Sequence, residues 1–166
     1  MKTLRILFVT LIICFPLILD AQDYSTLKDI QLTDSKSCLD AQSKVVECCD
    51  YLLKNPCVDN MTDLEATRFI MAWMGATPNF SFSFENEFFG ILKGDLNFTG
   101  RYLASMAKVA IENNFKTNSV DLQLKAITSV LEYSELPINK VKITKKLKKY
   151  IDAKNNGTLK DLIKVQ

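Results

Sequence analysis

The chain has 166 residues, a formal net charge of +2, and a composition that is 48% hydrophobic and 24% charged. It contains no histidine. This absence excludes Ser-His-Asp and Cys-His hydrolases, histidine general bases and H-E-x-x-H metalloproteases.

The N-terminus has the pattern of a signal peptide. Lys2 and Arg5 precede an uncharged apolar run over residues 6–19, which is typical of an export signal. As a helix this run would extend roughly 21 Å, which is too short for a hydrocarbon core of about 30 Å. We therefore expect a signal peptide over residues 1–21, cleavage after Ala21 and an exported (periplasmic or secreted) single domain over residues 22–166, with no transmembrane anchor after cleavage.

Helix signals follow in the first half of this domain. Ser35 or Ser37 can cap a helix that runs to about Lys54, where Asn55-Pro56 ends it. Thr62 and Glu65 form a capping box for a second helix that ends near Gly75. That second helix is apolar on nearly every side, which places it in the centre of the fold.

An aromatic segment comes next, with five phenylalanines within ten residues. The first three alternate with serine, as in a short strand or extended segment. Residues 83–93 fit one or two helical turns equally well. The phenylalanines are Phe80, Phe82, Phe84, Phe88 and Phe89.

The second half of the chain predicts further helices over residues 99–115, 119–134 and 139–153, and a short one from Thr158. The strand signals are few. The sequence therefore predicts an all-α domain of about five to six helices, arranged as an antiparallel helical bundle or as an irregular array of helical hairpins.

Four cysteines lie in the predicted mature chain, and an even number in an exported protein favours disulfides. Neighbouring Cys48 and Cys49 cannot pair without strain, so Cys38 would join one of them and Cys57 the other. On a continuous helix Cys38 and Cys49 would be about 16 Å apart, too far for a disulfide. Either the helix begins after Cys38, or Cys38 is unpaired. The alternative is four buried thiols. Without histidine or a C-x2-C spacing, we expect no metal and no cofactor.

The aromatic residues Trp73, Phe80, Phe82 and Phe84 are the candidate binding residues. They could line a groove for a peptide, lipid or glycan, because aromatic rings supply large contact area. The alternative is that they fill the core.

A basic face is expected near the C-terminus. From Asn139 onward there are nine lysines and only Asp152 and Asp161 as acids. Lys142, Lys145, Lys148 and Lys149 lie away from the apolar stripe of their helix, which suits an anionic surface or a merely solvated face. Nucleic acid is not an expected partner of an exported protein.

These features predict a non-enzymatic interaction or binding module whose partner is a protein, peptide or glycan. The alternative is a small carboxylate-dependent hydrolase, such as a glycan-acting enzyme. Glu85, Glu87 and Asp95 would then flank the aromatic segment as glycosidase acids flank sugar-stacking rings.

Several short motifs resemble a group of small exported helical proteins of unknown function. They are Trp73-Met74, Thr77-Pro78 with the aromatic stretch after it, and the closing Gly157-Thr158-Leu159. The resemblance implies export and a helical fold, and it implies no activity.

Overall fold

The computed structural model describes residues 24–163, so the predicted signal peptide lies outside the described residues. The described part contains eight α-helices, two short 3-10 helices and no strand, which confirms the all-α prediction. None of these helices is long and apolar enough to cross a membrane. The elements are η1 (Leu27–Asp29), α1 (Ser35–Asp40), α2 (Gln42–Lys54), α3 (Met61–Ala76), α4 (Glu87–Leu92), α5 (Leu96–Asn113), α6 (Val120–Glu135), η2 (Pro137–Asn139), α7 (Lys145–Asn155) and α8 (Leu159–Leu162).

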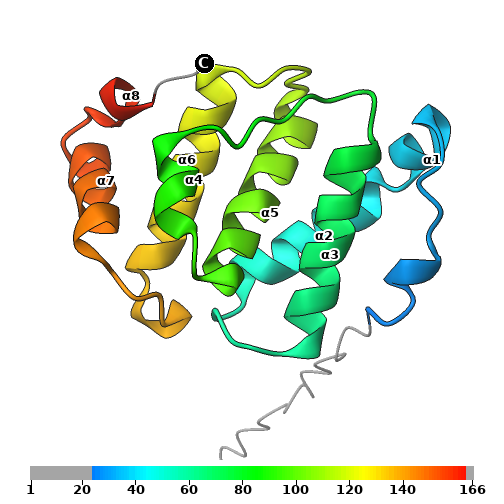
Figure 1. Cartoon of the computed structure of the whole chain (residues 1–166), viewed down its shortest axis with the longest axis horizontal. Helices are drawn as coiled ribbons and strands as arrows, with labels where there is room; N and C mark the ends of the chain where they lie inside the picture. The colour runs from blue at the N-terminus through cyan, green and yellow to red at the C-terminus, as the bar shows by residue number, and fades with distance from the viewer. Residues whose placement is uncertain (1–23, 164–166) are drawn as a thin grey trace, which may run out of the picture.

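Helix α5 forms the centre of the fold and contacts α2, α3, α4 and α6. It carries an unbroken run of buried residues over 100–107. Figure 1 shows α5 and α6 as an antiparallel pair, whereas α3 and α5 run in the same direction because residues 77–86 cross one end of the molecule between α3 and α4. The fold is therefore an irregular helical array and not a simple up-and-down bundle.

Helix α3 does not have the central position that its apolar sequence predicted. One face is buried through Ala66, Phe69, Ile70 and Trp73. The indole Nε1 of Trp73 donates a 2.8 Å hydrogen bond to the Cys38 carbonyl, which fastens α1 to α3. The opposite face of α3 is exposed and still apolar.

Several predicted helix boundaries are corrected by the capping groups. The predicted helix over 35–54 is two helices, because the chain turns at Ala41 between α1 and α2. Asn60, not Thr62, caps α3 by accepting a hydrogen bond from the Asp63 amide, and Asp95, not Thr99, caps α5 in the same way through the Phe98 amide. Thr144 caps α7, so the Lys-rich helix begins six residues later than predicted. Ser119 caps α6 as expected.

Candidate functional site

The exposed face of α3 carries large apolar side chains that the core does not use. Met61 is 64% exposed, Leu64 42% and Met71 54%. At spacings of three and seven residues these side chains lie along one side of the helix. Scattered exposed apolar residues are ordinary, whereas a row on one helix face indicates a contact surface.

This face borders an apolar groove of about 480 Å³, which we call the α3 groove. Its walls come from α3, from the aromatic segment with α4, and from α5. Leu96 stands at its edge with 84% of its surface exposed. The lining residues are Leu64, Thr67, Arg68, Met71, Met74, Gly75, Phe82, Phe84, Phe89, Leu96, Asn97, Thr99, Gly100 and Leu103.

The four predicted aromatic binding residues divide between the core and this groove. Trp73 and Phe80 are buried, with ring centroids 5.6 Å apart. Phe82 and Phe84 are half-buried and line the groove. Phe82 packs 6.2 Å from Trp73, and Phe84 packs 5.3 Å from Phe89. The core aromatic rings therefore support the rings that face the groove.

The aromatic segment is held in place along its length. The Ser81 amide donates a 2.9 Å hydrogen bond to the Lys116 carbonyl, just beyond α5. Asn86 accepts from the Phe89 amide to cap α4, while its side-chain nitrogen donates to Tyr102 Oη at 3.1 Å and to Gln123 Oε1 at 3.2 Å. A groove wall with such anchors is formed before any ligand arrives, which lowers the entropy cost of binding.

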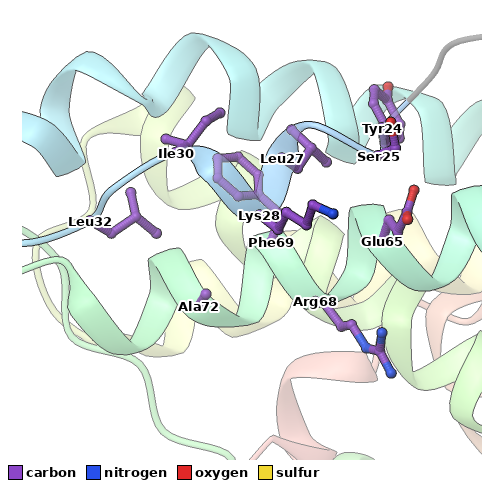
Figure 2. Close-up of a pocket in the computed structure, with 10 residues that line it drawn as sticks. All are labelled: Tyr24, Ser25, Leu27, Lys28, Ile30, Leu32, Glu65, Arg68, Phe69 and Ala72. Atoms are coloured by element: carbon purple, nitrogen blue, oxygen red, sulfur yellow. The ribbon is translucent and has the colours of Figure 1, made fainter.

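Arg68 is the only charged side chain among the described residues that line the groove. It is exposed and makes no ion pair or hydrogen bond with the described part of the chain. Figure 2 shows Glu65 and Arg68 leaving α3 on opposite sides. Arg68 thus gives an otherwise uncharged groove a cation without a partner.

A second hollow, drawn in Figure 2, lies between η1 and α3 and measures about 260 Å³. It is walled by the segment before α1 and by α3, and its lining includes the buried Leu27 and Phe69. Its volume is below the roughly 300 to 1,000 Å³ of ligand pockets. We assign it to the packing of residues 24–32 on α3.

The carboxylates of the predicted hydrolase lie apart from the groove lining. Glu85 is exposed, and Glu87 is exposed in the first turn of α4. The Asp95 carboxylate accepts a 2.9 Å hydrogen bond from the Phe98 amide as the cap of α5. None of the three lines the α3 groove.

The four cysteines Cys38, Cys48, Cys49 and Cys57 are free thiols in the described structure, so the predicted disulfides do not appear there. The first three are buried. Burial raises the pKa of Cys57, whose charged neighbours include Arg101, while Cys49 has Lys108 among its neighbours. Arg101 and Lys108 are about two turns apart on α5. Cys57 and Cys49 therefore lie beside different turns of α5.

The predicted basic face is exposed on α7 and on the segment just before it. Lys142, Lys145, Lys148 and Lys149 are all accessible. Lys148 pairs with Asp152 at 3.0 Å, and the other three have no ion pair within the described residues.

In the part of the chain that the structure describes, no group of His, Cys, Asp or Glu side chains could hold a metal ion.

Comparisons with other proteins add no relative: no family model, no curated protein and no solved structure matches the chain. The functional assignment therefore depends on the residues themselves.

Sequence reasoning missed three residues of the groove: Arg68, Met71 and Leu96. The excess of apolar residues in α3, on more sides than a core contact needs, was the signal that could have found Met71.

Proposed function

We propose that the protein is a non-enzymatic binding module whose α3 groove takes a single-chain amphipathic anion, such as a fatty acid. One observation carries this proposal: a preformed apolar groove contains one cation, Arg68, that no described residue neutralises. An apolar chain would cover Met71, Phe82 and Phe84, and its carboxylate would meet the Arg68 guanidinium.

The lining favours an acyl chain over a glycan. Sugar recognition needs several side-chain hydrogen-bonding groups, and the polar residues here are few. Thr99 already donates to backbone carbonyls, at 3.1 Å to Leu92 and 2.8 Å to Asp95. The groove volume of about 480 Å³ lies within the range of small-molecule pockets.

Titration of the purified protein with laurate, followed by calorimetry, tests the proposal. We expect saturable binding to one site, and affinity about tenfold weaker for decanoate because each buried methylene contributes about 0.8 kcal/mol. Dodecyltrimethylammonium, which has the same chain and a cationic head, should bind far more weakly than laurate.

Exposed residues of the groove supply variants that leave the core intact. Met71→Glu and Leu96→Glu should each weaken laurate binding at least about tenfold, since a carboxylate in the groove repels the ligand and wets its walls. Leu136→Glu is the matched control, because Leu136 is exposed to the same 54% as Met71 and does not line the groove. Equal losses in Met71→Glu and Leu136→Glu would refute the assignment, as would the absence of saturable binding.

A further inference from the structure

The connection from α6 to α7 combines exposed aliphatic side chains with lysines. Leu136 is 54% exposed, Ile138 70% and Ile143 44%. The lysines around them are exposed, and their side chains make no ion pair or hydrogen bond with the described residues. We call this set the α6–α7 surface: Leu136, Ile138, Ile143, Lys140, Lys142, Lys145, Lys146 and Lys149.

The start of α7 does not favour the lysines that it carries. Lys145 and Lys146 begin α7, which has no acidic residue in its first turn, although the helix dipole disfavours cations at that end. Lys140 ends η2 in a left-handed backbone conformation, with φ of 55°, and its amide donates a 3.2 Å hydrogen bond to the Pro137 carbonyl.

Two other lysines of the same region are paired with carboxylates. Lys148 binds Asp152 at 3.0 Å, and Lys154 binds Glu135. The region therefore contains both paired and unpaired lysines. The unpaired lysines gather beside the three aliphatic residues that the core leaves exposed.

We propose that the α6–α7 surface docks on an anionic lipid bilayer. The lysines would contact the lipid phosphates and carboxylates, and Ile138, Leu136 and Ile143 would enter the headgroup region. A soluble polyanion would match the lysines alone, because it offers nothing apolar for the aliphatic side chains to enter. The aliphatic residues therefore select a membrane over a polysaccharide or a nucleic acid.

This surface adjoins the α3 groove without being part of it. Lys142 lines a hollow of about 620 Å³ that shares Leu64, Leu96 and Asn97 with the groove. Docking by this surface does not require an occupied groove. The two proposals can therefore fail separately.

Co-sedimentation with vesicles tests the lysines. The purified protein should bind phosphatidylcholine vesicles containing about one-third phosphatidylserine and should not bind phosphatidylcholine alone. Lys145→Gln/Lys149→Gln should lower the partition coefficient at least about tenfold. The control variant Lys36→Gln/Lys54→Gln removes the same number of positive charges, from i,i+4 ion pairs elsewhere on the surface. It should leave the partition coefficient unchanged.

The aliphatic residues are tested in the same assay. Ile138→Ser/Ile143→Ser should weaken binding to the phosphatidylserine vesicles at least about fivefold, while retention on heparin resin stays that of the wild type. Leu39→Ser, which removes a 55% exposed aliphatic side chain elsewhere, is the control. Met71→Glu should bind vesicles like the wild type, since it alters only the groove.

Three results would overturn the proposal: no preference for phosphatidylserine, full vesicle binding by Ile138→Ser/Ile143→Ser, or loss of vesicle binding in Met71→Glu alone. The second would make the surface a general polyanion site, and the third would assign vesicle binding to the α3 groove.

Discussion

The guanidinium of Arg101 on α5 pairs with the carboxylate of Asp63 on α3, and neither side chain is more than 1% exposed. Arg101 also donates to the Pro56 carbonyl at 2.9 Å and to the Asn97 carbonyl at 3.3 Å. Burial acts against the charge of Arg101, but the bond to Asp63 prevails and raises the pKa of the guanidinium. The pair thus holds α3, α5 and the loop after α2 together, and it fixes the two helices that wall the groove.

Breaking this pair should destabilise the protein strongly. Asp63→Ala leaves the Arg101 charge buried without its partner, which costs about 3–5 kcal/mol of unfolding free energy. The double variant Asp63→Leu/Arg101→Met removes both charges and should lose less than the sum of the two single changes. Urea unfolding of Asp63→Ala, of Asp63→Leu, of Arg101→Met and of the double variant measures these losses. If Asp63→Ala lowers the free energy of unfolding by less than about 1 kcal/mol, the pair does not hold α3 and α5 together.

Replacing two helical glycines with alanine should change the stability of the protein in opposite directions. A Cβ at Gly100 would lie 2.7 Å from Thr67 Oγ1 and 3.2 Å from Thr67 Cγ2, where α5 approaches α3. Gly100→Ala should therefore cost about 1–3 kcal/mol, and adding Thr67→Ala should recover much of the loss. A Cβ at Gly90 in α4 would meet no heavy atom within 4 Å.

Gly90→Ala is the matched comparison and should stabilise the protein by about 0.5–1 kcal/mol through helix propensity. Thermal unfolding of both single variants gives the comparison. Stabilisation by both would mean that α3 and α5 are farther apart than the structure places them.

The thiols should react with alkylating reagents in an order set by burial. Burial, with a contribution from Glu47, raises the pKa of Cys48 to about 12, and burial also raises the pKa of Cys49. Because the thiolate is the reactive form, iodoacetamide at neutral pH should modify the half-buried Cys57 first and Cys48 at least about a hundredfold more slowly. Peptide mass spectrometry without reductant measures the rates.

Denaturation should then make all four thiols reactive. Modification of Cys48 before Cys57 would contradict the burial of Cys48 in the structure. Finding fewer than four reactive thiols in the denatured protein would instead favour the disulfides that the sequence predicts for an exported chain.

Acid should weaken the fold partly through Asp50. Burial acts to raise the pKa of this carboxyl, but hydrogen bonds from Lys108 at 2.5 Å and Lys54 at 2.9 Å lower it below its ordinary value of 3.8. The folded pKa is thus below the unfolded one. The pairing therefore stabilises the protein above about pH 4 and is lost as the pH falls through the folded pKa.

Asp50→Asn should accordingly be less stable than the wild type at pH 7, by less than about 1 kcal/mol because the pairs are partly exposed. The difference should shrink toward zero in strong acid. Urea midpoints measured across this range test the sign, and a difference that grows on acidification would reverse it.

Much of the fold was predictable because its helices follow local signals. Ser119 caps α6 as its sequence indicates, and the break at Asn55-Pro56 ends α2 as expected. Two of the boundary errors came where two candidate caps lay close together. Asn60 and Asp95 each begin a helix earlier than the threonine that the sequence favoured, since local patterns do not rank neighbouring caps.

The candidate site was predictable only in part. The aromatic segment drew attention to Phe82 and Phe84, but the same reasoning included Trp73 and Phe80, which the core buries. Arg68 and Leu96 lie on different helices. No local pattern could place them at one groove, because their proximity depends on how α3 and α5 pack.

The central claim, that the α3 groove binds an amphipathic anion, is tested most directly by NMR of methionine methyl groups during titration with laurate. Met71 and Met74 line the groove, whereas Met106 is fully buried in α5 and serves as the internal reference. We predict saturable shifts of the Met71 and Met74 methyl signals with Met106 unchanged. Signals of Met71 and Met74 that stay in place while laurate binds, or that move no more than that of Met106, would contradict the claim.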